Sequence, residues 1–164
     1  MNIPLTLENL TRETALVLAT DEGIASLAAE TQSQADWLVN IGWNPAIDND
    51  SIPAPLAVVI PLSESQALGS PKSMHVKISL WLHNSEGAPE IINQLYVFNA
   101  VPMAAKFSDT IEAALRMRFG QTDAKLIVFD KQFDFNTWFE SGLVNVTIDM
   151  AVELARSLGR SFLI

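Results

Sequence analysis

A strict alternation of apolar and polar residues over positions 74–83 constrains the fold more than any other part of this sequence. Successive side chains of a β-strand point to opposite faces of the sheet, so a strand here has one apolar and one polar face. The apolar positions are Met74, Val76, Ile78, Leu80 and Leu82, and the other positions are His75, Lys77, Ser79, Trp81 and His83. We therefore expect one face of this strand on the core and the other exposed, with the large Trp81 ring making the exposed face a contact surface.

A second strand is expected just before this one. Residues 56–60 are apolar, they are entered through a Pro-rich segment at 52–55, and Pro61 closes them. The connection over residues 62–72 is rich in Ser and contains Gly and Pro, which is typical of a mobile loop. The two strands predict a long antiparallel hairpin. Its loop is either a contact arm in an assembly or a disordered segment.

Helices are expected before and after this hairpin. Apolar residues at helical spacing predict two helices, or one broken helix, over residues 6–40, with Thr6 as the N-cap and an interruption at 20–23. Residues 89–99 favour a helix, because Pro89 and Glu90 suit a first turn, although the aromatic and β-branched residues nearby also favour a strand.

The last third of the sequence predicts one more helix and two strands. The helix is capped by Ser108 or Asp109 and ends at Gly120. Residues 125–130 are typical of a buried strand, and period-2 alternation from 144 predicts a strand to about Ala151, although 148–158 also admits a helix. The expected fold is one α+β domain over residues 1–164. It has an antiparallel sheet of about four strands packed by helices, in the order α(α)-β-β-α(α)-β-β.

Composition limits the partners. Ten Lys and Arg against 19 Asp and Glu give a net charge of −9, which argues against nucleic acid and anionic membranes as partners. The absence of cysteine excludes disulfides and thiol chemistry. No stretch has the length of a signal peptide core or of a membrane span, so a soluble cytoplasmic protein is expected. Only 18% of residues are charged and 49% are hydrophobic, which indicates spare apolar surface for a homo-oligomer.

No catalytic motif is present, and we expect no catalytic, cofactor-binding or metal-binding residue. The Gly-rich phosphate loops and the Gly-x-Ser-x-Gly elbow do not occur. His75 and His83 lie about 27 Å apart on one strand and cannot share a metal ion. Asp48 and Asp50 lack the other ligands of a calcium loop.

The pattern over residues 50–150 resembles the tail-terminator and head–tail connector proteins of long-tailed bacteriophages. The resemblance lies in an Asp-rich loop followed by IPAPLAVVI at 52–60, HVKISLW at 75–81 and the closing strand GLVNVTIDM at 142–150. It implies a non-enzymatic α+β subunit of a ring, often a hexamer, that caps the tail tube and joins it to the head. The implied partners are other copies of the chain and tail-tube or connector proteins, and the implied location is the virion, assembled in the host cytoplasm.

The candidate interface consists of the polar strand face and the apolar C-terminus. Its residues are His75, Lys77, Ser79, Trp81, His83, Phe162, Leu163 and Ile164. On this hypothesis Trp81→Glu breaks the assembly and leaves the fold intact. Two other classes stay open: a small acidic binding module, of the secretion-chaperone or immunity type, that masks a partner protein, and an enzyme of unfamiliar type.

Overall fold

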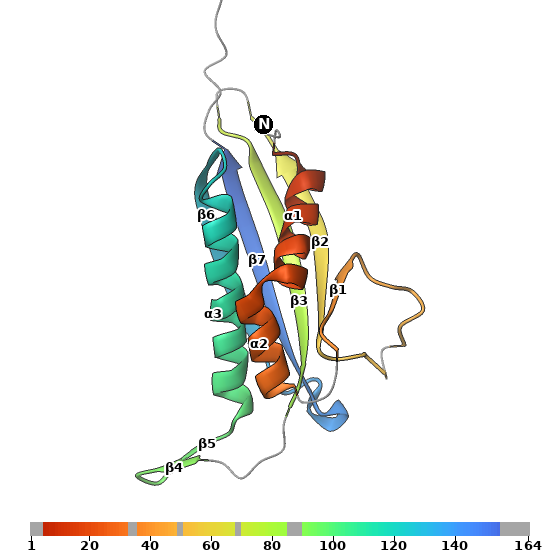
Figure 1. The fold of residues 1–164 in the computed structure, drawn as a ribbon, viewed down its shortest axis with the longest axis vertical. Coiled ribbons are helices and arrows are strands. Elements are labelled where there is room, and N and C mark those ends of the chain that lie inside the picture. Colours follow the sequence, from red (N-terminus) through yellow and green to blue (C-terminus); the bar gives the residue numbers. More distant parts are fainter. Residues whose placement is uncertain (1–4, 33–35, 49–50, 68–69, 85–89, 155–164) are drawn as a thin grey trace, which may run out of the picture.

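A five-stranded mixed sheet and the helices on one of its faces form the body of the protein (Figure 1). The computed structural model describes residues 5–32, 36–48, 51–67, 70–84 and 90–154. Three helices lie on the near face of the sheet in Figure 1, and no helix of these segments covers the far face. The expected α+β class is confirmed.

The sheet has the strand order β1-β2-β3-β7-β6. Its strands are β1 (Leu38–Ile41), β2 (Leu56–Ser65), β3 (Ser73–His83), β7 (Leu143–Leu154) and β6 (Ala124–Asp134). Neighbouring strands of the sheet are antiparallel, except that β1 runs parallel to β2. The expectation of about four antiparallel strands is therefore wrong. Residues 38–40, which the sequence predicts as the end of a helical region, belong to the additional parallel strand β1. A four-residue strand offers too few positions for its period to be recognised.

The alternation in β3 has the expected consequence. β3 pairs with β7 without interruption from Ser73↔Glu153 to His83↔Leu143. The apolar positions of both strands point toward the helices and are buried. β2 and β3 form the predicted hairpin, but β2 continues to Ser65, inside the expected 62–72 loop, so the connection is shorter than predicted.

The two N-terminal helices, α1 (Leu7–Thr20) and α2 (Glu22–Thr31), meet at Asp21. Thr6 is the N-cap of α1, and its hydroxyl accepts a hydrogen bond from the Asn9 amide at 3.1 Å. Asp21 has an extended backbone, which ends α1, and its carboxylate accepts from the Ile24 amide at 3.0 Å, which starts α2. The break predicted at 20–23 is confirmed. The predicted helical region is too long at its end, since α2 stops at Thr31.

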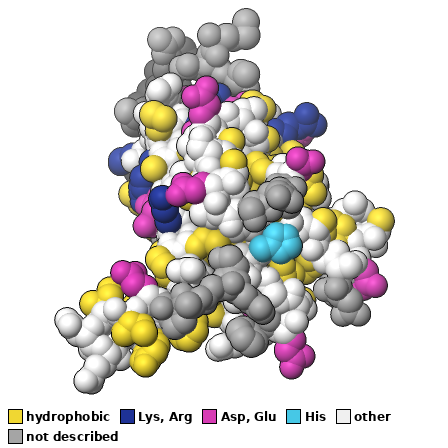
Figure 2. Space-filling view, turned by 60° about the horizontal axis from the view of Figure 1, so that its bottom comes forward, with side chains coloured by type: hydrophobic (Ala, Val, Ile, Leu, Met, Phe, Trp, Pro, Cys, Tyr) yellow, Lys and Arg dark blue, Asp and Glu magenta, His cyan; other side chains and the backbone are white. Residues whose placement is uncertain are grey.

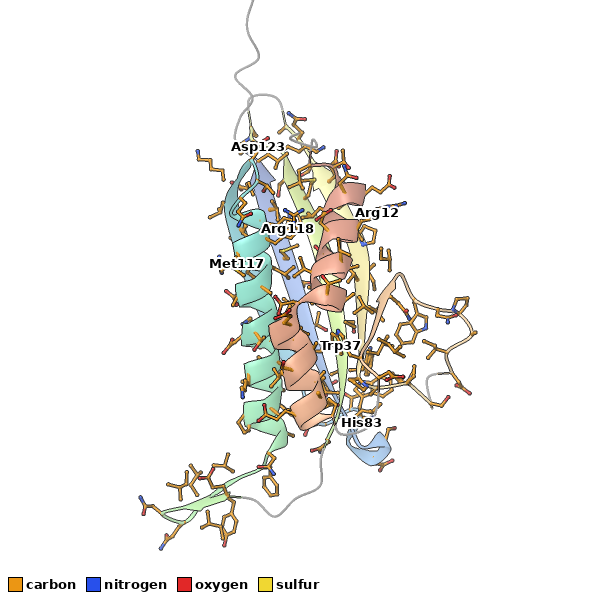
Figure 3. All side chains as sticks on the ribbon, viewed as in Figure 1. Arg12, Trp37, His83, Met117, Arg118 and Asp123 are labelled. Carbon is orange, nitrogen blue, oxygen red and sulfur yellow. The ribbon has the colours of Figure 1, made fainter. Side chains whose placement is uncertain are left out.

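The third helix, α3 (Ala100–Phe119), ends before Gly120 as predicted, but its N-cap is Asn99, nine residues before the predicted cap Ser108. Ser108 is buried inside α3 and its hydroxyl donates to the Ala105 carbonyl, so it caps nothing. Pro102 lies in the first turn, where a missing amide hydrogen costs little. Near the other end of α3, Arg118 donates to Glu13 of α1 at 2.6 Å (Figure 3).

The helix expected over residues 89–99 is wrong. The chain forms a two-stranded ribbon instead, β4 (Glu90–Ile92) and β5 (Leu95–Val97), joined by Asn93 and Gln94. Both connecting residues have positive φ, 47° and 71°, as a two-residue hairpin turn requires. The ribbon projects from the lower end of α3 in Figure 1.

The strand predicted at 125–130 exists, but it is not buried. It belongs to β6, an edge strand in which Leu126 and Val128 are exposed. A short 3₁₀ turn (Phe139–Ser141) follows, and β7 then continues to Leu154. The helical alternative for 148–158 is wrong as far as residue 154, and its remainder lies outside the described residues.

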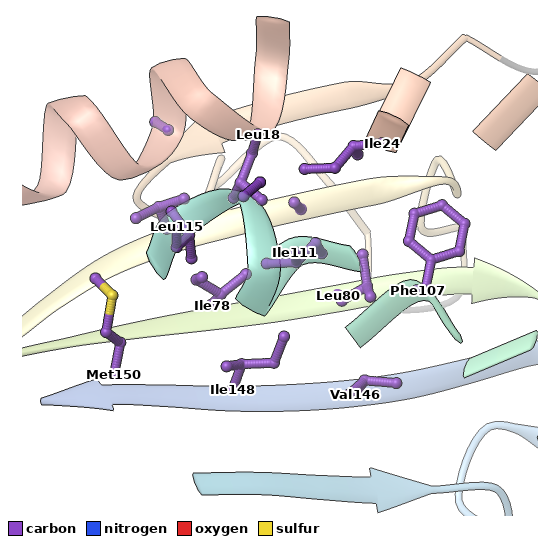
Figure 4. Close-up of a cluster of buried hydrophobic side chains, with 14 of the residues drawn as sticks. Leu18, Ile24, Ile78, Leu80, Phe107, Ile111, Leu115, Val146, Ile148 and Met150 are labelled. Atoms are coloured by element: carbon purple, nitrogen blue, oxygen red, sulfur yellow. The ribbon is translucent and has the colours of Figure 1, made fainter. Parts of the chain in front are cut away.

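The main core lies between the helices and the near face of the sheet (Figure 4). Leu18 of α1, Ile24 of α2 and Phe107, Ile111 and Leu115 of α3 meet Ile78, Leu80, Val146, Ile148 and Met150 of the two central strands. All ten side chains are fully buried. This layer holds the helices against the sheet.

Candidate protein–protein interface

The strand face predicted as the interface is mostly half-buried. His75, Lys77 and Ser79 are partly accessible and His83 is exposed, but Trp81 retains only 7% of its surface. The expectation that Trp81 is exposed is wrong. Phe162, Leu163 and Ile164 lie outside the described residues.

Trp81 belongs to a second, smaller core on the far face of the sheet. The centroid of its ring lies 4.6 Å from that of the Trp138 ring, in an edge-to-face arrangement, and 6.3 Å from that of the Trp43 ring. The other members of this cluster come from β2, from the segment before it and from the start of β7: Ile52, Ala54, Leu56, Val58 and Leu143. Residues distant in sequence therefore cover the ring, and its indole N–H has no hydrogen-bond partner among the described residues. A substitution at Trp81 tests the fold and not an interface.

The rest of this face carries charge in one cross-strand row. Lys77 is opposite Asp149, and Asp149 is opposite Asp130 on the edge strand. Like charges directly opposite each other are unfavourable, so Lys77 on the other side of Asp149 compensates part of the repulsion. Among the described residues no three potential ligands gather in a metal-ion site. The row supplies a polar surface on this face of the sheet.

The largest exposed apolar feature of the described chain is the ribbon with the residue after it. We call residues 90–98 the arm. Its exposed side chains are Ile91 (63%), Ile92 (47%), Leu95 (61%), Tyr96 (61%) and Phe98 (60%). In the space-filling view hydrophobic side chains gather on this projection at the lower left (Figure 2).

The arm is apolar on both faces. Ile91 is paired with Tyr96, and Ile92 with Leu95. Paired residues of an antiparallel ribbon share a face and neighbouring pairs point to opposite faces. An ordinary surface hairpin has one polar face, so this ribbon has no side that suits water.

The exposed apolar area on the arm is comparable to the largest patch of a typical monomeric protein, and such patches often mark contact sites. With about 150–200 Å² on each large side chain, five side chains exposed by roughly half or more offer on the order of 500 Å². A standard protein–protein interface buries about 800 Å² on each partner. An isolated two-stranded ribbon is at best marginally stable in water, so contact with another surface would also stabilise the arm itself.

Sequence reasoning missed the arm because its apolar residues also occur at helical spacing. Ile91, Leu95 and Phe98 share a face in a helix, and that assignment places them on the core. The signal that identifies the arm is Asn93 between two apolar pairs, since Asn tolerates positive φ in a two-residue turn.

No protein-family model matches this sequence, and a search of curated proteins found no match either. Among the described residues, no helix combines the length and the apolar character needed to cross a membrane.

Proposed function

We propose that this chain is a structural subunit that assembles with copies of itself into a ring, using the arm as its main contact. The observation that carries the proposal is that the arm is apolar on both faces and projects from the body. The resemblance to tail-terminator and head–tail connector proteins suggests where such a ring acts. It joins a phage tail tube to the head, and its further partners are tail-tube or connector proteins of the virion.

The position of the arm suits a ring. A projection at one end of a subunit can reach a different surface on its neighbour, and where the neighbour's arm does not return the contact, this head-to-tail contact either closes into a ring or continues as a filament. The net charge of −9 makes the subunits repel one another at long range, so short-range apolar contact must hold them together. An acidic lumen also suits passage of DNA without binding.

The test is absolute mass by light scattering behind a sizing column, over a range of protein concentrations. The arm variant combines Ile91→Ser with Tyr96→Ser, which makes one face of the ribbon polar. The matched control is Leu16→Ser on α1, because Leu16 is 54% exposed and lies outside the arm. We expect several subunits per particle, six for a hexamer, for the natural chain and the control, and a monomer for the arm variant.

Three outcomes contradict the proposal in different ways. A natural chain that is monomeric at every concentration overturns self-assembly. An arm variant with unchanged mass overturns the role of the arm. A stable dimer overturns the ring and favours the acidic binding module.

A further inference from the structure

A groove on the helical layer has the chemistry to receive the arm. It has a volume of about 780 Å³ and runs along the outer side of α3 beside the junction of α1 and α2. Its floor is apolar and includes Pro102, Ala105, Ala113 and Met117. Met117, labelled in Figure 3, is the most exposed large hydrophobic side chain of the described residues, at 66%. A thioether at this position adapts to the shape of a partner.

We propose that the arm of one copy lies in this groove of a second copy, with Glu90 of the arm beside Lys106 of the groove. This inference rests on the self-assembly proposed above and names the surface that receives the arm. The groove is shallow and open, so it covers one apolar face of the ribbon. Because the arm extends away from its own α3 in Figure 1, the groove that it fills belongs to another copy.

Charge complementarity supports this pairing. Glu90 is the only charged residue of the arm, and no ion pair joins it to another described residue. In the groove, Asp109 forms an ion pair with Lys131 at 2.7 Å. Asp21 is the N-cap of α2, and its carboxylate accepts a hydrogen bond from the Ile24 amide. Lys106 is exposed and has no ion pair within the described part of the chain. Within the described residues, the groove therefore offers one cation without an ion pair to an arm with one carboxylate without an ion pair.

The absence of cysteine in the natural sequence allows a direct test by cross-linking. One chain carries Val97→Cys, since Val97 is paired with Glu90 in the arm, and a second, affinity-tagged chain carries Ala105→Cys next to Lys106. Both changes are small in volume and leave the exposed apolar residues of the arm intact. After mixing under oxidising conditions, we expect the disulfide-linked heterodimer several-fold above that from a Leu16→Cys partner. A yield no higher than this control overturns the groove assignment.

Charge exchange gives a second readout. Glu90→Lys and Lys106→Glu should each weaken the assembly, and the two together in one chain should restore its mass. If the arm variant of the previous section is monomeric but neither single exchange changes the mass, the arm docks elsewhere and the proposed function stands. If the natural chain is monomeric, the proposed function fails as well, so the two failures are distinguishable.

Discussion

The side chain of Gln32 and the main chain of His83 exchange two hydrogen bonds. Gln32 Oε1 accepts from the His83 amide at 2.6 Å, and Gln32 Nε2 donates to the His83 carbonyl at 3.4 Å. Gln32 is 98% buried at the end of α2, and His83 is the last residue of β3. This pair ties the helical layer to the sheet at the end from which the arm projects.

Gln32→Leu should lower the free energy of unfolding by about 1–3 kcal/mol, since it leaves a main-chain donor at His83 without a partner near the core. The shape of the side chain is nearly preserved, so packing contributes little to the loss. Chemical denaturation measures the difference. The matched control is His83→Ala, which keeps the main-chain groups that Gln32 binds. A Gln32→Leu chain as stable as the natural one would show that the hydrogen-bonded pair does not stabilise this end.

The central strands could be predicted from the sequence because their pattern is local. β3 and β7 alternate over ten or more residues, and each alternation identifies the face that meets the core. The break at Asp21 could also be predicted, because its cap needs only neighbours within one turn. The parallel pairing of β1 could not, since it depends on contact between Leu38 and Leu56 across an intervening loop.

The candidate site was harder to predict because it depends on contacts between residues that are distant in the sequence. Alternation placed Trp81 correctly on the face away from the helices, but it carried no information on what covers that face. Trp43 and Trp138 do so from segments 38 residues before and 57 residues after it. In the arm the helical and strand patterns overlap over a few residues, and the turn at Asn93 and Gln94 decides between them.

Trp81→Ala should therefore act as a core substitution and lower the free energy of unfolding by about 3–5 kcal/mol. Trp43→Ala is the matched control, because Trp43 contacts the same ring but remains 39% exposed, and its loss should be clearly smaller. Thermal unfolding followed by tryptophan fluorescence measures both. A Trp81→Ala chain as stable as the natural one would mean that the ring is not buried in solution.

An ion-pair network between α3 and β6 should make stability depend on pH. Hydrogen bonding from Lys131 lowers the pKa of Glu112, a second bond from Arg116 adds to this effect, and burial opposes it. Burial also opposes the charge of Lys131, but hydrogen bonds to Asp109 and Glu112 outweigh burial and raise its pKa. The Glu112 contribution is fully present above the ordinary value of 4.5 and is lost as pH falls through the lowered pKa. The Lys131 contribution is present below 10.5 and is lost as pH rises through the raised pKa.

Glu112→Gln should consequently cost about 1 kcal/mol near neutral pH, and this difference from the natural chain should shrink as pH falls from 4.5 through the lowered pKa of Glu112. Urea denaturation between pH 3 and 8 follows the difference. Glu8→Gln is the control, because Glu8 and its partner Arg12 are about 70% exposed and such pairs contribute little. A difference that persists unchanged at pH 3 would assign the effect of the substitution to packing.

Replacing Gln94 by Gly should strengthen the assembly without adding a contact. Gln94 has a φ of 71°, which costs an L-residue about 1 kcal/mol and costs glycine almost nothing. A better-formed ribbon needs less ordering when it docks, so the dissociation constant should fall by roughly fivefold. Concentration-dependent light scattering measures this constant. Asn93→Gly is the matched control and should change it less, because Asn already tolerates positive φ. Weaker assembly of the Gln94→Gly chain would show that the arm changes its turn when it binds.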